Sequence, residues 1–253
     1  MNKLKSLRLG WGVIPVVIFL GIWEITARLH LASDRFFFPP FSEVVKEFYF
    51  LTINGVLGDN FFSSLTRVII GFCLGAILGV ATGIIMGWKN IIDKVLNPII
   101  SLLYPIPALG WLPLLMLWIG INEFLPIMII FICSFFPILY NTVTGIKNVN
   151  KNYVQVARTL GASDLKIIFT VVLPLALPNI FTGLRLESGM AWRVIIAAEM
   201  VAIPTGIGAL MMRAESLLRI DIIIVCLIVL GIMSFFFEKF FAFLEKKITN
   251  HWR

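Results

Sequence analysis

Four ionisable side chains lie inside one long apolar stretch, where they could form ion pairs or bind a charged solute. They are Arg185, Glu187, Arg193 and Glu199. Charged groups are costly in an apolar medium, so we expect them to face other protein segments or water. Two roles are open: structural ion pairs with other helices, for example with Arg67, or attraction of an anionic substrate along a pathway. Pairing lowers the cost of burial, which favours the structural role.

Patterns that carry enzyme chemistry are absent from the sequence. It contains no GxxxxGK[ST] phosphate loop, no HExxH and no serine nucleophile elbow. The three cysteines, Cys73, Cys133 and Cys226, stand alone in separate apolar runs without CxxC spacing. This favours small buried side chains over a metal site or a disulfide. We therefore predict no catalytic residue, no metal and no cofactor in this chain.

The composition is typical of a membrane protein that crosses the bilayer several times. Of 253 residues, 59% are hydrophobic and 14% charged, and the mean hydropathy is +0.97. A soluble domain is nearer half apolar and about a quarter charged. The net charge of +7 comes from cations that cluster at the ends of apolar runs. That pattern sets membrane orientation and does not indicate a nucleic-acid partner.

The apolar runs predict an all-α polytopic membrane protein with one domain over residues 1–253. A helix needs about 20 apolar residues to cross a bilayer core. Six stretches qualify as transmembrane spans. The predicted spans are 11–29, 62–87, 97–120, 124–146, 172–203 and 221–244.

Lysine and arginine positions predict the orientation in the cell membrane. With both termini in the cytoplasm, the inner segments carry twelve of these cations and the outer segments five. Positive residues are retained on the cytoplasmic side, so we reject the reverse orientation. Residues 147–171 are then cytoplasmic and residues 30–61 external, with a short surface helix at 42–51 after the Pro39-Pro40 break.

Two of the predicted spans have unusual backbone composition. The second has a glycine at every fourth position, which favours a close helix crossing, either within the chain or at a dimer seam. These glycines are Gly71, Gly75, Gly79, Gly83 and Gly87. The third should be bent or broken and packed against other helices, because prolines remove backbone donors. These prolines are Pro98, Pro105, Pro107 and Pro113.

A polar segment between the fourth and fifth spans predicts a small structure outside the membrane. Between Tyr153 and Pro178 we expect a short amphipathic helix, a turn at Gly161, and a second helix that enters the membrane at Pro174. Val156, Leu160 and Ala157 would form an apolar strip for a partner. An ordinary helix lying on the membrane surface is the simpler alternative.

This segment resembles the cytoplasmic loop of permease subunits of binding-protein-dependent ABC importers. The loop pattern is Glu-Ala-Ala, three residues, Gly, nine residues, then Ile-x-Leu-Pro. The sequence matches it at Ala157, Gly161, Leu173 and Pro174, and departs from it at Gln155, Val156 and Val171. Further segments are similar to the sulfonate, taurine and nitrate branch of these permeases. They are 38–44, 64–68, 105–114, 183–187, 191–193 and 197–200.

The resemblance implies how such a chain would work. Two permease copies, here a homodimer, would form the pathway, and an extracytoplasmic binding protein would deliver a sulfonate, taurine, nitrate or related solute. Cytoplasmic ATPase subunits would bind ATP and Mg and dock on the loop. The implied docking residues are Gln155, Val156, Ala157, Leu160, Gly161 and Pro174.

Two alternatives to this reading stay open. The same importer class also carries heterocyclic vitamin precursors and other nutrients. A secondary transporter driven by ion gradients belongs to a different class and should show internal repeats with interrupted helices. The two halves of this sequence are unlike, since the glycine strip and the proline-rich span have no counterpart after residue 150.

Overall fold

The computed structural model describes residues 2–29 and 37–249, with side chains of the first helix described from Ile14 on. Within those residues the chain is helical and contains no strand, so the predicted all-α class is confirmed. The α-helices are α1 (Asn2–Arg28), α2 (Phe41–Ile53), α3 (Val56–Trp88), α4 (Asn90–Leu103), α5 (Leu112–Ile119), α6 (Phe124–Lys147), α7 (Lys151–Thr159), α8 (Asp164–Ile167), α9 (Leu173–Ala202), α10 (Ile207–Ser216) and α11 (Ile220–Thr249). A 3-10 turn, η1 (Ala108–Trp111), precedes α5, and a π-helical segment, η2 (Ile168–Val172), precedes α9.

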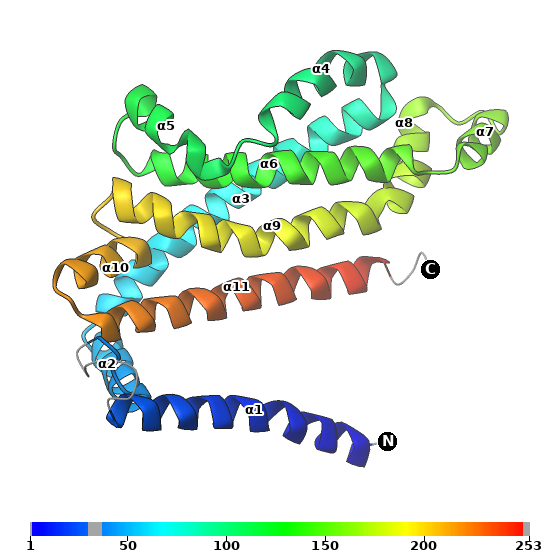
Figure 1. Ribbon diagram of the computed structural model, residues 1–253. Coiled ribbons are helices and arrows are strands. Elements are labelled where there is room, and N and C mark those ends of the chain that lie inside the picture. Colours follow the sequence, from blue (N-terminus) through cyan, green and yellow to red (C-terminus); the bar gives the residue numbers. More distant parts are fainter. Residues whose placement is uncertain (1, 30–36, 250–253) are drawn as a thin grey trace.

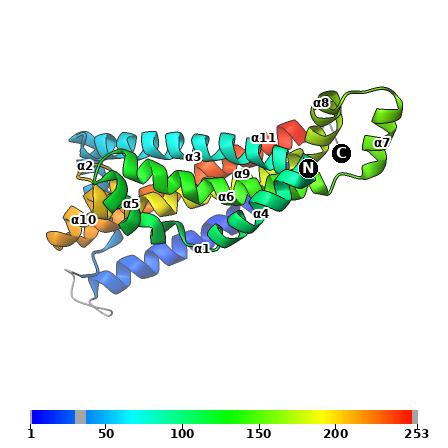
Figure 2. The same cartoon turned by 90° about the horizontal axis from the view of Figure 1, so that it is seen from above.

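The long helices α3, α6, α9 and α11 run alongside one another between two ends of the molecule (Figures 1 and 2). One end carries α2, α5 and α10. The other carries α7 and α8, and the start of α1 and the end of α11 lie at that same end. The short helix expected at 42–51 is present as α2, at the end opposite α7. Residues 30–36 of the predicted external segment lie outside the described residues.

Four helices in the described part are long and apolar enough to cross a membrane. They are α3, α6, the continuous helix Asp164–Ala202 and α11. A fifth crossing results if α4 and the Ala108–Ile119 helix count as one span, although they are bent by 85°. The predicted break in the third span is therefore confirmed, and it falls where Pro105 and Pro107 interrupt the helix. The first three residues of the predicted span at 11–29 lie outside the described side chains.

The glycine strip of α3 is the surface on which α6 packs. A Cβ added at Gly83 would lie 2.6 Å from the Cβ of Thr142, and one at Gly75 would lie 2.8 Å from the Cβ of Ser134. The other three glycines of the strip meet α6 in the same way. The sequence left two possibilities, a crossing within the chain or a dimer seam. All five glycines meet α6 of the same chain, so the strip forms the crossing within the chain. Small residues allow the close backbone contact through which helices associate in lipid.

A second close crossing joins α6 to α9 and was not predicted. A Cβ at Gly145 would lie 2.8 Å from the Cβ of Asn179, and one at Gly183 would lie 2.9 Å from the Cβ of Asn141. Single glycines on two helices carry no periodic signal, so only the structure reveals this crossing. Together the two crossings make α3, α6 and α9 one tightly packed layer.

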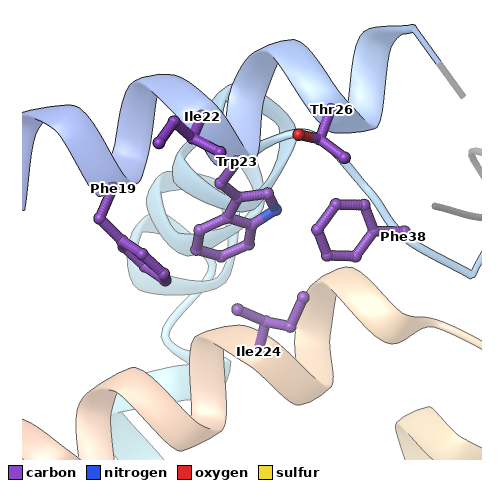
Figure 3. A pocket seen from close by; sticks show the side chains of 6 residues that line it. All are labelled: Phe19, Ile22, Trp23, Thr26, Phe38 and Ile224. Carbon is purple, nitrogen blue, oxygen red and sulfur yellow. The ribbon is translucent and has the colours of Figure 1, made fainter. Parts of the chain in front are cut away.

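Helix α1 is attached to the bundle at the α2 end. Helix α2 begins after Pro40, which provides no side-chain cap, and Glu24 of α1 accepts hydrogen bonds there from the Ser42 backbone N–H (3.0 Å) and hydroxyl (2.9 Å). The Trp23 indole donates to the Pro39 carbonyl at 3.1 Å. Figure 3 shows the Trp23 ring beside Phe38 and facing Ile224 of α11, at a cavity of about 530 Å³. Elsewhere the exposed apolar face of α1 is suited to lipid.

Candidate functional site

Helix α7 begins and ends with well-formed caps, although it contains only nine residues. The Asn150 side chain accepts a hydrogen bond from the Asn152 N–H at 2.9 Å. At the other end Gly161 has a φ of 78°, its N–H donates to the Arg158 carbonyl, and the Ala162 N–H donates to the Ala157 carbonyl. This pair of bonds defines a Schellman turn, which favours glycine at its left-handed position. The predicted helix and glycine turn are confirmed.

One face of α7 is exposed and apolar. Leu160 is 82% exposed, Val156 59% and Tyr153 57%. The opposite face, with Val154 and Ala157, packs on a buried cluster formed by the ends of α6 and α9. The prediction that Ala157 belongs to the outward strip is therefore wrong. Ala157 is half-buried, at the edge of that cluster.

The chain after Gly161 is helical from Asp164 to Ala202, through α8, η2 and α9. The predicted loop 147–171 thus ends in a helix that is continuous with the fifth span. Pro174 lies inside this continuous helix, directly after the π-helical segment, so its missing N–H falls where the regular α-helical hydrogen bonding is already interrupted. A π-helical segment locally changes the helix register and is frequent at functional sites.

Basic side chains connect α7 to the end of α3 and to the start of α8, and connect the end of α6 to α4. The Arg158 guanidinium lies 5.9 Å from the centre of the Trp88 ring and 3.3 Å from the Asp164 carboxylate. Lys147, at the end of α6, pairs with Asp93 of α4 at 2.6 Å. The Gln155 side chain is exposed, next to these groups. The helix is therefore held to the bundle by one packed face and a few exposed polar contacts.

At the opposite end, Arg67 is 5% exposed and bridges two carboxylates. It lies 2.7 Å from Glu199, which is fully buried, and 2.6 Å from Glu123, which is 65% exposed. It also donates to the Thr205 carbonyl and hydroxyl. The predicted pairing of Arg67 with a charged residue of the fifth span is confirmed, with Glu199 as its partner.

Glu199 has further partners that complete this buried network. It accepts hydrogen bonds from the Ser64 hydroxyl at 2.8 Å and from the Gly208 N–H at 3.0 Å. Asn60 accepts from the Gly206 N–H at 2.9 Å. The network joins α3, α9 and the loop before α10 and satisfies the buried charge, which is a structural role. Glu123 was missed by the sequence analysis, although its position in a turn at the same end as Arg67 is a usable signal.

The remaining three charged residues of α9 do not form one site. Arg185 lies 3.3 Å from Glu245 of α11. Glu187 is buried and accepts a weak hydrogen bond from the Cys133 thiol at 3.7 Å. Arg193 is exposed and forms no ion pair among the described residues; its side chain contacts the Met190 sulfur at 3.6 Å. Neither arginine pairs with Glu187 or Glu199, since Glu199 bonds to Arg67 and Glu187 to Cys133.

No group of three His, Cys, Asp or Glu residues in the described part of the chain could hold a metal ion. The described part consists of membrane-length helices with a short exposed helix at one end, joined by the Gly161 turn to the helix that contains α9. These features are those of a protein that crosses a membrane several times. The chain belongs to the family of binding-protein-dependent transport system inner membrane components, whose signature matches residues 53–250.

Two relatives with named functions match nearly the whole chain. The taurine transport system permease protein TauC of Escherichia coli is 32% identical, covering 98% of this chain and 95% of TauC. The nitrate import permease protein NrtB of a Synechocystis strain is 34% identical, covering 93% and 88%. A crystal structure of an amino acid ABC transporter with histidines has a TM-score of 0.62 over 79% of this chain and 97% of its own, at 17% identity. TauC and NrtB support the predicted sulfonate, taurine and nitrate branch of the family, and the amino acid transporter structure supports the fold.

Proposed function

We propose that this chain forms the translocation pathway of an ATP-driven importer, as a homodimer in the cell membrane, and that α7 is its coupling helix. In this proposal α1 is the first of six spans, and α7 and both chain ends lie in the cytoplasm. The observation that carries the proposal is the exposed apolar face of α7, which the Gly161 turn joins to the continuous helix from Asp164 to Ala202. Family membership supports the same assignment.

The geometry of α7 suits transmission of force. Val154 and Ala157 fix it to the bundle, and the uninterrupted helix from Asp164 to Ala202 extends from its turn through the membrane. Closure of two ATPase subunits on ATP and Mg would move the paired α7 helices and tilt α9 with them. The energy must come from a partner, since the sequence has no phosphate loop.

The opposite end, with α2, α5 and α10, would face the extracytoplasmic binding protein. There the Arg67 network fixes the loop before α10 to α3 and α9. That rigid surface provides a fixed platform, whereas the moving parts would be the paired α7 helices and the spans they tilt. In this proposal the α2, α5 and α10 end accepts solute from the binding protein, and the α7 end binds the ATPase.

The substrate we propose is a small solute with an anionic oxygen group, such as a sulfonate, taurine or nitrate. The named relatives support this class. Arg193 is the residue of α9 suited to meet it, because an exposed and unpaired arginine at membrane depth needs water or an anion. Transport of taurine and nitrate by Arg193→Gln and Arg193→Lys tests this: loss in Gln with rescue in Lys supports it, and unchanged uptake of both solutes contradicts it.

The coupling role of α7 is tested by changing its exposed face. We expect Val156→Ser with Leu160→Ser to abolish co-purification of the ATPase subunit and substrate-stimulated ATP hydrolysis, while the permease still inserts. Leu217→Ser is the matched control, since Leu217 is 71% exposed at the opposite end. Normal hydrolysis in the double variant would overturn the docking proposal. Uptake by the purified chain without any ATPase would instead favour an ion-coupled transporter.

A further inference from the structure

A polar cavity of about 810 Å³ opens at the α7 end of the bundle. It lies between the α3–α4 junction, the end of α6 and α7. Four cationic side chains line it against a single carboxylate, that of Asp164. The cations are Lys89, Lys147, Lys151 and Arg158. A concentration of positive charge in a hollow raises the local concentration of anions.

Two of the four cations are already paired. Lys147 bonds to Asp93 at 2.6 Å, and Arg158 bonds to Asp164 at 3.3 Å. Lys89 and Lys151 are exposed and form no ion pair with any described residue. Two uncommitted ammonium groups from different segments therefore border the same hollow, one at the start of α4 and one at the start of α7.

The cavity is also bordered by the ends of apolar spans. Gly87, Ile146 and Val172 line its inner part, and Trp88 stands at the end of α3. Tryptophan is enriched where a helix leaves the hydrocarbon core. The outer face of the adjoining α4 is apolar, with Ile91 79% exposed and Val95 62% exposed. A ligand with an anionic head and apolar chains matches this combination.

We propose that this cavity binds the phosphate headgroup of an anionic phospholipid from the adjacent leaflet. Lys89 and Lys151 pair with the phosphate, and the acyl chains lie along the apolar face of α4. Basic pockets beside transmembrane helices bind such headgroups through the same chemistry. The bound lipid links α7 to the α3–α4 junction. The proposal rests on the membrane placement of the bundle, and it does not require ATPase docking.

Lipid retention by the purified permease tests the proposal. The permease is extracted from bilayers of equal phosphatidylglycerol and phosphatidylcholine, and retained lipid is counted by native mass spectrometry. Each cation near an anionic surface contributes roughly fivefold in affinity, so Lys89→Gln with Lys151→Gln should weaken phosphatidylglycerol retention about 25-fold. The matched control is Lys94→Gln with Lys166→Gln, which removes two exposed lysines that do not line the cavity.

Equal phosphatidylglycerol retention by the two double variants would overturn the proposal. A titration with inorganic phosphate separates the two sources of the anion. Saturable phosphate binding that depends on Lys89 and Lys151, without selective lipid retention, would assign the site to a soluble phosphate compound. Loss of the lipid on assembly with the ATPase would show that the partner fills the cavity. ATPase co-purification in the same variants reports separately on the coupling proposal.

Discussion

At one end of the bundle Arg67 is 5% exposed and bonded to a fully buried Glu199, whereas at the other end Arg158 is 57% exposed and paired with Asp164, itself 63% exposed. Both are arginine–carboxylate pairs, but they differ in what surrounds them. The first pair is enclosed by α3, α9 and the loop before α10, and the second connects a small helix to the outside of the bundle. The buried Arg67–Glu199 pair therefore holds helices together at one end, whereas the exposed Arg158–Asp164 pair leaves α7 open to solvent at the other.

Removing the buried arginine should have the largest effect. Arg67→Met leaves the Glu199 carboxylate buried without its cation, and breaking such a pair costs roughly 3–5 kcal/mol. The measurement is the free energy of unfolding in a denaturing-detergent titration. Glu123→Gln is the control, because Glu123 is 65% exposed and its loss should cost less than about 1 kcal/mol. Equal losses in the two variants would remove the contrast between buried and exposed partners.

A substitution at the α3–α6 glycine crossing should have the next largest effect on the unfolding free energy. Gly83→Val places a side chain where a Cβ alone would lie 2.6 Å from the Cβ of Thr142, and overpacking costs roughly 1–3 kcal/mol. Gly231→Val in α11 is the control, since nothing lies within 4 Å of a Cβ there. Unfolding titrations of both variants measure the difference. A larger loss at Gly231 would contradict the assignment of the strip to α6.

A change in the α7 turn should separate stability from coupling. Gly161→Pro cannot adopt the φ of 78° required there, since proline is fixed near −65°. We expect the unfolding free energy to fall by more than about 1 kcal/mol, because proline also removes the N–H that bonds to the Arg158 carbonyl, and we expect complete loss of substrate-stimulated ATP hydrolysis. Gly161→Asn, which tolerates the left-handed region, should keep part of the activity. Full hydrolysis in the proline variant would show that the turn does not orient the coupling helix.

The exposed arginine pair should have the smallest effect on stability. Arg158→Gln removes a pair that is open to solvent on both sides, so the unfolding free energy should fall by less than about 1 kcal/mol. The same titration used for Arg67→Met makes the comparison direct. A loss as large as that of Arg67→Met would mean that α7 is part of the rigid bundle.

Much of the fold was predictable because it depends on local composition. The prolines after α4 and the glycine of the α7 turn each act within a few residues of their own position, and the spacing of the α3 glycines marks a packing face without naming its partner. The family pattern around Gly161 added the proposal that α7 docks on an ATPase. Predictions were weaker where a residue's partner is distant in the chain: Ala157 was assigned to the wrong face of α7, and Glu123 was missed beside Arg67.

The sequence by itself determined that the chain is helical, membrane-spanning and equipped with a capped helix outside the bundle, because apolar length, glycine and proline act on the backbone locally. Only the tertiary structure decided which helix meets the glycine strip, which carboxylates surround Arg67, and which cations remain unpaired beside α7. Those outcomes depend on how far neighbouring helices are shifted along one another, because that shift decides which side chains meet. The spacing of residues within one helix does not determine the shift between two helices.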